Sequence, residues 1–426
     1  MNVLLLGGGA REHALGWKLT QSPLLNSLTS LPGNPGLAEL GTVVDGISPT
    51  NAGAVAAFAR RHDIDLVVVG PEAPLAAGVI DALTRQGVRA FGPSRAAARL
   101  ESSKSFAKAI MERAGVPTAA AGVFTSREPA VDYLDKQSGP FVVKADGLAA
   151  GKGVLVTDDR GQASAWLDRC LNGEFGEAGH TVVIEDYLAG PEVSMFALCD
   201  GKEAVPLQPA RDYKRLRRGD RGPNTGGMGC FSPVDDLPAG LIDWTLDQVM
   251  RPVLQQMKSE GVTYQGSLYA GLVLTEQGPQ VLEFNCRLGD PETQVVLPLL
   301  EDDLVEVILA CLDGEAGALN LTWSSAAAVD VVLAAAGYPE SPRRGDPITG
   351  LAAAGAMPGV LIFQAGTIRQ QEALKTNGGR VINVVGTGAT LAEARQRAYT
   401  AAEGIGFAGK QFRPDIAESA ETRGTS

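Results

Sequence analysis

Two oxygen-bearing side chains near the end of a strand-like run could hold a divalent cation. Glu283 and Asn285 belong to the run VLEFNCR, and because side chains alternate along a strand, both point to one face. Carboxylate and amide oxygens at this spacing suit Mg²⁺, which takes few protein ligands and keeps phosphate oxygens and water. Arg287 continues the face and offers a two-pronged donor to an anion. An exposed polar face on an edge strand would show the same alternation, so both interpretations stay open.

A glycine-rich loop between two apolar runs could handle phosphate. In FVVKADGLAAGKGVLV, Lys144 ends the first run and Lys152 lies among three glycines. The loop is not a Walker A motif, because only three residues separate Gly147 from Gly151 and Gly153 stands where Ser or Thr belongs. The runs predict a β-hairpin in which a rigid strand lysine and a flexible flap cover a triphosphate. A structural hairpin whose glycines only relieve turn strain is the alternative.

The run VVIEDYLAGPE could bind the adenosine part of a nucleotide. A strand ends around Glu185 and Leu188, turns at Gly190 and returns at Glu192. Free backbone groups in such a hinge can pair with the edge of adenine, and a nearby carboxylate can accept both ribose hydroxyls. An acidic hairpin is the ordinary alternative, because acidic turns are common.

A basic, glycine-rich stretch could bind an anionic substrate. Six basic residues lie between Arg211 and Arg221 in a chain whose formal net charge is −12, and they run directly into NTGGMG. Glycines allow backbone donors to approach an anion closely. A solvated charged loop is the usual alternative for such a run.

Chain length, net charge and cysteine content limit the class of protein. A chain of 426 residues can form two to four domains, and its acidity argues against a nucleic-acid or membrane-surface role. Five dispersed cysteines without a CxxC pair suit a reduced cytoplasm better than a disulfide framework. The N-terminus lacks the basic segment of a signal peptide, and no apolar run is long enough to span a bilayer. We therefore expect a cytoplasmic protein with neither nucleic-acid nor membrane partners.

The elements that must position these groups change along the chain. Strand-like NVLLLG, LTSL, IDLVVVG and VRAFGPS alternate with helical segments, which predicts an N-terminal parallel sheet. The ends of the first three strands, Gly7–Glu12, Gly33–Gly36 and Gly70–Glu72, should converge on one crevice. Paired strands from residue 141 onward predict an antiparallel α+β region, and a smaller α+β unit begins at about residue 324. We expect the tail AESAETRGTS to be frayed.

The order of these signals resembles that of the ATP-grasp ligases. A strand lysine, a glycine-rich flap, an acidic hinge and a late Glu-x-Asn strand follow one another, and the words AREHAL, GNPG, GPE, VVKADGLAAGKGV, GPNTGGMG and LEFNCRLGDPETQ are similar to those of the phosphoribosylamine–glycine ligase family. The resemblance runs from residue 1 to about 420. It implies an N-terminal α/β substrate domain (1–103), an ATP-grasp core (104–323) with a mobile lid subdomain (118–190), and a small C-terminal α+β domain (324–426).

The resemblance also implies a reaction. ATP, glycine and 5-phosphoribosylamine would give glycinamide ribonucleotide, ADP and phosphate through glycyl phosphate, a step of de novo purine biosynthesis, with Mg²⁺ or Mn²⁺ as the metal. Positioning and charge neutralisation would do most of the catalytic work. The partners would be the small-molecule substrates; a monomeric state and a transient contact with the preceding pathway enzyme both stay open.

Residue roles follow from the same resemblance. Lys104, Lys144 and the flap residue Lys152 would contact ATP, Glu185 and Leu188 would present backbone to adenine, and Glu192 would hold the ribose. Glu283 and Asn285 match the metal ligands, while Arg287, Lys144 and Asp290 would be catalytic. The phosphoribosylamine site would comprise Gly9, Arg11, Asn34, Gly36, Gly70, Glu72, Asp212, Lys214, Asn224, Thr225, Gly226 and Gly227.

The sequence departs from the family pattern at a few positions. Ala10 stands where glycine is general, and Cys230 where a smaller residue such as alanine is usual. The strand GSLYAGLVL lacks the first metal carboxylate that many ATP-grasp relatives carry, which leaves the number of bound metal ions open.

Three other readings compete with this one. A nicotinamide-dependent dehydrogenase would need a full G-x-G-x-x-G, but Gly7, Gly8 and Gly9 are contiguous and Glu12 replaces the third glycine. A different ATP-grasp carboxylate–amine ligase would lack GPNTGGMG, GNPG and GPE. A nucleotide-binding protein without activity would not need the lysines and the Glu-x-Asn pair.

Overall fold

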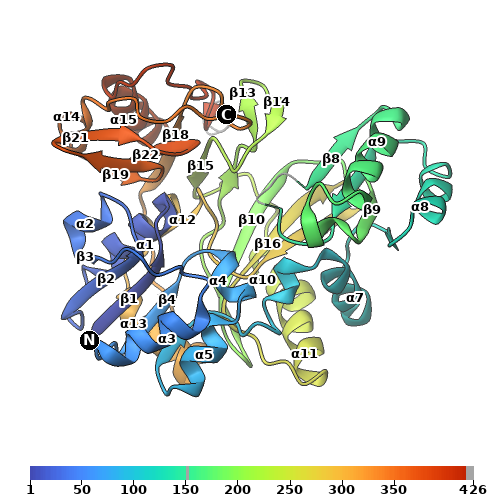
Figure 1. Cartoon of the computed structure of the whole chain (residues 1–426), viewed down its shortest axis with the longest axis horizontal. Coiled ribbons are helices and arrows are strands. Elements are labelled where there is room, and N and C mark those ends of the chain that lie inside the picture. The colour runs from blue at the N-terminus through green and yellow to red at the C-terminus, as the bar shows by residue number, and fades with distance from the viewer. Residues whose placement is uncertain (150–152, 419–426) are drawn as a thin grey trace.

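The N-terminal part of the chain forms a parallel sheet between two layers of helices (Figure 1). The structure is a computed structural model that describes residues 1–149 and 153–418. The strand order is β3-β2-β1-β4-β5, and every pairing is parallel. Alternate residues of β1 face different cores: Val3 and Leu5 pack with helix α1, whereas Leu4 and Leu6 pack with helix α3. The elements are β1 (Asn2–Gly7), α1 (Ala10–Leu19), β2 (Ser27–Pro32), α2 (Leu37–Leu40), β3 (Thr42–Val43), α3 (Ala52–Arg61), β4 (Leu66–Val69), α4 (Glu72–Ala76), α5 (Val79–Arg85) and β5 (Arg89–Phe91).

Two short helices lead from this sheet into the middle of the molecule. They are α6 (Arg99–Ser102) and α7 (Lys104–Ala114). The hydroxyl of Ser103 caps α7 by accepting a hydrogen bond from the Phe106 amide, and Gly115 ends the helix in a left-handed conformation. This cap fixes Lys104 at the first helical position.

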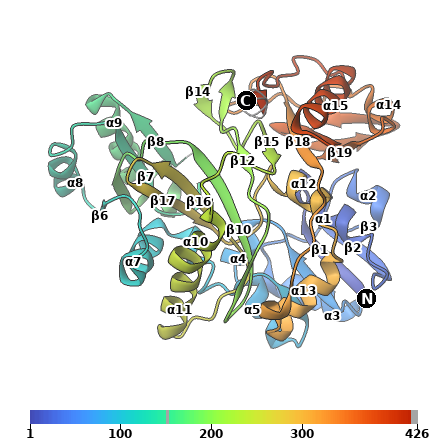
Figure 2. The ribbon, with the colours of Figure 1, turned by 180° about the vertical axis from the view of Figure 1, so that it is seen from behind.

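Residues 121–186 form a separate antiparallel sheet, here called the lid sheet, at the far side of the molecule from the N-terminal sheet (Figures 1 and 2). Its strand order is β6-β9-β7-β8, and its helices pack on it around a hydrophobic cluster of its own. The prediction that FVVK and GVLV pair as a hairpin is confirmed, because Lys144 pairs with Val154. The elements are β6 (Ala121–Phe124), α8 (Arg127–Leu134), β7 (Phe141–Ala145), β8 (Val154–Thr157), α9 (Arg160–Leu171), the 3₁₀ helix η1 (Gly176–Gly179) and β9 (Val182–Asp186).

A second antiparallel sheet, the core sheet, lies between the lid sheet and the N-terminal sheet (Figure 2). Its strand order is β11-β10-β16-β17. Strand β9 belongs to the lid sheet and β10 to the core sheet, so the acidic stretch between them is an inter-sheet connection, and the alternative of an acidic hairpin is wrong. The elements are β10 (Glu192–Asp200), β11 (Ala204–Pro206), α10 (Leu241–Thr245), the π-helical segment η2 (Leu246–Met250), α11 (Arg251–Ser259), β16 (Gln265–Thr275) and β17 (Gly278–Asn285).

The C-terminal sheet includes two strands, β12 and β15, from the middle of the chain. Its order is β12-β15-β18-β22-β19, and β12 and β15 flank the basic stretch, which itself forms the hairpin β13–β14. The C-terminal part lies above the N-terminal sheet in Figure 1. The elements are β12 (Arg211–Asp212), β13 (Arg215–Arg217), β14 (Arg221–Asn224), β15 (Gly229–Ser232), β18 (Ala327–Ala334), α14 (Leu351–Gly355), β19 (Val360–Gln364), β20 (Thr367–Gln370), β21 (Ala373–Thr376), β22 (Arg380–Gly388) and α15 (Leu391–Gly404).

The predicted fold class is confirmed, with a parallel N-terminal sheet followed by antiparallel α+β regions. Helix α12 (Thr293–Val296), the 3₁₀ turns η3 (Leu297–Leu299) and η4 (Ala316–Ala318), and helix α13 (Leu304–Asp313) connect the core sheet to the C-terminal sheet. All five cysteines are free and buried. Within residues 1–149 and 153–418, no helix combines the length and apolar character needed to cross a membrane. Lys152 and most of the tail predicted to be frayed lie outside the described residues.

Candidate active site

Glu12 organises the crevice at the carboxyl ends of the parallel strands. Its carboxylate accepts a hydrogen bond of 2.7 Å from the Gly9 amide and pairs with Arg11 at 2.6 Å. A Cβ on Gly70 would lie 2.2 Å from Glu12 Oε1, so only glycine at the end of β4 leaves room for this carboxylate. Gly9, Arg11 and Gly70, which were predicted to bind substrate, are therefore brought together. Glu12 therefore engages both the Gly9 amide and the Arg11 guanidinium at this end of α1.

The turn that follows β2 is hydrogen-bonded to the C-terminal sheet. The Asn34 amide donates to the carbonyl oxygens of Gly8 at 3.0 Å and Gln364 at 2.7 Å. A Cβ on Gly36 would lie 2.1 Å from the ring of His13, which explains the glycine through packing. His13 Nδ1 accepts a hydrogen bond from the Gln364 amide, and burial lowers the pKa of the imidazole to about 4. These contacts give His13 a structural role between the N-terminal and C-terminal parts.

Arg287 joins the substrate crevice to the end of β17. Its guanidinium lies 3.5 Å from Glu72 and 3.2 Å from Glu101, and it donates to Asn285 Oδ1 at 3.2 Å. Burial opposes ionisation of Glu72, but Arg287 outweighs it together with Arg11 and lowers the pKa of this carboxyl. One side chain therefore contacts both a predicted substrate residue and a predicted metal ligand.

Three lysines and one glutamate meet where the lid sheet faces helix α7. Glu185 is buried and pairs with Lys144 at 2.8 Å and Lys108 at 3.4 Å. Lys104 donates to the Gly147 carbonyl at 3.3 Å, and burial lowers its pKa even though Glu283 and Asp146 lie near. Lysines held this way can neutralise phosphate oxygens at little cost in ordering. Leu188 lies half-buried in the connection that follows Glu185.

Glu283 faces this group of cations from the core sheet. Burial opposes its ionisation, but Lys214, Lys144 and Lys104 outweigh it and lower the pKa of the carboxyl. Glu283 and Asn285 provide oxygen ligands only, a donor set that suits Mg²⁺. The described residues contain no cluster of three or more His, Cys, Asp or Glu arranged for a metal, so phosphate oxygens and water would have to complete the coordination.

The basic stretch is only partly available to a ligand. Lys214 pairs with Glu192, the predicted ribose ligand, and accepts a hydrogen bond from Thr225 Oγ1 at 2.8 Å through its carbonyl oxygen. Burial raises the pKa of Asp212 to about 7, against the opposing effect of Lys214. Arg211 pairs with Asp236, and Arg218 with Glu418. Asn224, predicted to bind substrate, lies exposed at the end of β14.

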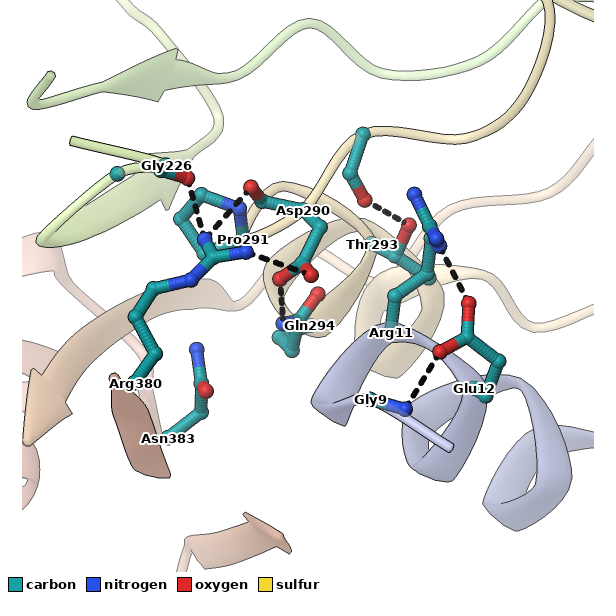
Figure 3. A network of polar contacts seen from close by, with 12 residues as sticks. Gly9, Arg11, Glu12, Gly226, Asp290, Pro291, Thr293, Gln294, Arg380 and Asn383 are labelled. Carbon is teal, nitrogen blue, oxygen red and sulfur yellow. Dashed lines mark hydrogen bonds and ion pairs between the residues drawn. The ribbon is translucent and has the colours of Figure 1, made fainter. Parts of the chain in front are cut away.

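Asp290 lies between the N-terminal and C-terminal parts (Figure 3). It accepts hydrogen bonds from Gln294 and Arg380, each at 2.8 Å, and a Cβ on Gly9 would lie 3.9 Å from its Oδ2. Burial would raise the pKa of Asp290, but Arg380 and Arg11 outweigh it and lower that pKa. The sequence predicted Asp290 but missed its strongest partner, Arg380.

The contacting residues that the sequence did not reveal share one property: each pairs with a predicted site residue. They are Glu12, Glu101, Lys108 and Arg380. Glu12 and Lys108 could have been found from the sequence, because Glu12 is next to Arg11 and Lys108 is four residues from Lys104. Arg380 comes from a distant strand and had no local signal.

Lysines of the lid sheet and helix α7 face Glu283 of the core sheet across the space between two antiparallel sheets. This arrangement is the one expected of an ATP-grasp protein. The family models agree with this class: phosphoribosylglycinamide synthetase N domain matches residues 1–101, its ATP-grasp (A) domain residues 102–293, and its C domain residues 328–419. The chain belongs to the phosphoribosylglycinamide synthetase family of ATP-grasp ligases.

Relatives and a solved structure agree over nearly the whole chain. The chain is 47% identical to a phosphoribosylamine–glycine ligase of Mesorhizobium japonicum, with 99% of each chain covered, and 48% identical to one of Streptomyces coelicolor, also with 99% of each covered. The crystal structure of phosphoribosylamine–glycine ligase from Thermotoga maritima is similar at 37% identity, with a TM-score of 0.86, and covers 98% of this chain and 100% of its own.

Proposed function

We propose that this chain joins glycine to 5-phosphoribosylamine at the expense of ATP, giving glycinamide ribonucleotide, ADP and phosphate in purine biosynthesis. The observation that carries the proposal is the position of Arg287. Its guanidinium reaches Asn285, beside the lysine-lined site, and Glu72, in the crevice of the parallel sheet. A nucleotide and a second substrate bound at these two places would therefore meet within the length of one side chain.

The reaction has two balanced steps. A carboxylate oxygen of glycine attacks the γ-phosphorus, the bond to the β,γ-bridging oxygen breaks, and ADP leaves with that electron pair. The amine nitrogen of phosphoribosylamine then attacks the acyl carbon of glycyl phosphate, phosphate leaves, and the nitrogen loses a proton to water. Arg287 would neutralise the carboxylate and the acyl phosphate in turn, because it lies between the two sites.

The residue roles in this proposal are those that the family resemblance implies. Lys104 and Lys144 would contact the phosphates, with Lys152 closing over them; Glu185 and Leu188 would present backbone to adenine; and Glu192 would hold the ribose. Asp290 would orient glycine or its acyl phosphate. The phosphoribosylamine crevice would comprise Gly9, Arg11, Asn34, Gly36, Gly70, Glu72, Asp212, Lys214, Asn224, Thr225, Gly226 and Gly227.

Glu283 and Asn285 would hold Mg²⁺ or Mn²⁺, which supplies charge neutralisation at the phosphates. Positive side chains surround Glu283, so the local field repels a free cation until the negative charge of a nucleotide offsets it. We therefore expect the nucleotide to bring the metal with it.

The wider setting belongs to the same proposal. The division into residues 1–103, 104–323 with a lid at 118–190, and 324–426 is our working domain scheme. The cytoplasm is the compartment we propose, because the reaction consumes ATP and the five cysteines are free.

A coupled assay of ADP release tests the function. Sustained ADP release over many turnovers should require ATP, glycine and phosphoribosylamine together, with the amine generated in situ from ribose 5-phosphate and ammonia. Mass spectrometry should find glycinamide ribonucleotide. ADP release that ignores the omission of glycine or of the amine would contradict the proposal. Replacing glycine with alanine gives a matched control for the carboxylate substrate.

A further inference from the structure

Arg380, the first residue of β22 in the C-terminal sheet, reaches into the predicted substrate site (Figure 3). Its Nη1 donates to the carbonyl oxygens of Gly226 and Asp290, the latter at 2.8 Å, and its Nη2 donates to Asp290 Oδ2 at 2.8 Å. Within the described residues, these are all the hydrogen bonds of the guanidinium. One planar group therefore holds two segments that lie 64 positions apart in the sequence. One carries Gly226 of the predicted substrate site, and the other carries Asp290, which was predicted to be catalytic.

The loop that contains Gly226 and Gly227 has a second contact with the C-terminal part. The Gly226 amide donates to the hydroxyl of Tyr338 at 2.9 Å, so hydrogen bonds from the C-terminal part reach both the N–H and the C=O of Gly226. A Cβ on Gly226 would lie 3.1 Å from Cζ of Arg380. Gly227 has a φ of +104°, and a Cβ there would lie 2.5 Å from Pro291. Glycine at both positions lets the loop lie flat against the guanidinium and the segment that carries Asp290.

The contacts of Arg380 are confined to one half of the site. Lys144 pairs with Glu185 on the lid sheet and Lys104 bonds to Gly147, and none of the bonds of Arg380 reaches these two lysines. Both Arg380 and Asp290 are largely buried, with side chains 18% exposed, so this ion pair is shielded from solvent and fixes geometry more firmly than a surface pair does. Loss of the guanidinium should therefore affect the amine and the glycine that Asp290 would orient, but not ATP.

We propose that Arg380 is a positioning residue of the phosphoribosylamine site, by which the C-terminal domain fixes the Gly226 loop and Asp290 at the distance that lets amine and acyl phosphate meet. The identity of the substrate rests on the proposed function. The positioning itself rests on contacts between Arg380, Tyr338, Gly226 and Asp290.

Steady-state kinetics of Arg380→Ala test the inference. We expect the apparent KM for phosphoribosylamine to rise at least about tenfold, while the KM for ATP stays within about twofold of the unaltered enzyme. Arg380→Lys should lie between the two, since it keeps the charge but loses the fork. Added guanidinium at low millimolar concentration should restore part of the activity of Arg380→Ala. Arg369→Ala, which removes an exposed arginine of the same domain, is the matched control and should leave all three KM values unchanged.

A second measurement separates this inference from the proposed function. Calorimetric binding of ribose 5-phosphate should be weaker in Arg380→Ala and in Tyr338→Phe than in the unaltered protein. If the unaltered protein binds ribose 5-phosphate but shows no glycine-dependent turnover, the proposed function fails and weaker binding in the variants still supports the inference. Equal changes in the KM of ATP and of the amine, or equal ribose 5-phosphate binding in all variants, would overturn it.

Discussion

Glu283 is a carboxylate surrounded by positive charge rather than by other acids. Lys104, Lys144 and Lys214 all lower its pKa, and burial is the only large effect in the opposite direction. Such an arrangement contributes electrostatic attraction to the folded state even without a ligand. It also means that the carboxylate is ionised at neutral pH and ready to bind a cation that arrives with phosphate. At the scale of single residues, this charge arrangement supports the proposal that a nucleotide and its metal bind together.

Replacing this carboxylate tests its role in metal binding. Glu283→Gln keeps the size and removes the charge, so we expect turnover to fall by a factor of about 100 or more, as for loss of one group that stabilises transition-state charge. The melting temperature should change little, because the side chain faces the site and not a hydrophobic cluster. Glu276→Gln, in the exposed turn between the same two strands, is the matched control and should keep full activity. Near-normal turnover in Glu283→Gln would remove Glu283 from the metal site.

The two lysines of the hairpin should differ in importance. Lys144 is held on β7 by Glu185 at 2.8 Å, whereas Lys152 belongs to the glycine-rich flap of the sequence. A pre-organised cation contributes more to the transition state than one that must first be ordered, so Lys144→Ala should lower kcat more than Lys152→Ala does. Single-turnover rates of ADP formation at saturating ATP measure both. The opposite order would show that flap closure, not the strand lysine, limits the reaction.

At the scale of elements, the ends of parallel strands supply the crevice because short turns leave room for one large side chain. Gly7 ends β1 and Gly70 directly follows β4, and the space that these glycines leave contains the carboxylate of Glu12. The sequence predicted this convergence from the alternation of strands and helices, since parallel strands with right-handed crossovers end at one edge. It did not predict that Glu12 would use the Gly9 amide, because the rotamer of a side chain depends on neighbours that the sequence does not place.

The glycine at the end of β4 can be tested directly. In Gly70→Ala the new methyl group would lie 2.2 Å from Glu12 Oε1, so the carboxylate must move and release Arg11 and Gly9. We expect the KM for phosphoribosylamine to rise about tenfold while the KM for ATP stays unchanged.

A control for backbone effects is available in the same domain. Gly53→Ala, where the new methyl group has only Asn51 at 3.8 Å, lies in helix α3 and should be neutral or stabilise the fold by roughly 0.5–1 kcal/mol. If Gly70→Ala leaves the KM for phosphoribosylamine unchanged, Glu12 does not shape the crevice as inferred.

At the scale of the whole molecule, the domains are interleaved in a way that the order of the sequence conceals. Strands β12 and β15 belong to the central segment but pair within the C-terminal sheet, and β9 and β10 follow each other yet lie in different sheets. Apolar runs predicted β9 and β10, but β12 and β15 lie in the stretch that the sequence described only as basic and glycine-rich. Pairing between distant strands depends on tertiary packing, so the sequence could not show that Arg380 would meet Gly226 and Asp290. The site residues with a local motif were therefore predictable, and their partners from other domains were not.

The contact between the N-terminal and C-terminal parts should make the protein sensitive to acid through one histidine. His13 is buried against Phe363 and accepts a hydrogen bond from the Gln364 amide, and its pKa falls from 6.5 to about 4. Between these two values the unfolded chain binds a proton that the folded protein does not, so stability falls as the pH decreases from about 6.5 to about 4. A pKa difference of this size corresponds to about 3 kcal/mol of folding free energy.

His13→Asn keeps a neutral acceptor and removes the titration. It should lower the melting temperature at pH 7.5 but show a smaller further loss at pH 5 than the unaltered protein. His62→Asn, which removes an exposed histidine at the end of α3, should retain the full loss. Melting temperatures of the three proteins that decrease in parallel from pH 7.5 to pH 5 would show that His13 is not the group responsible.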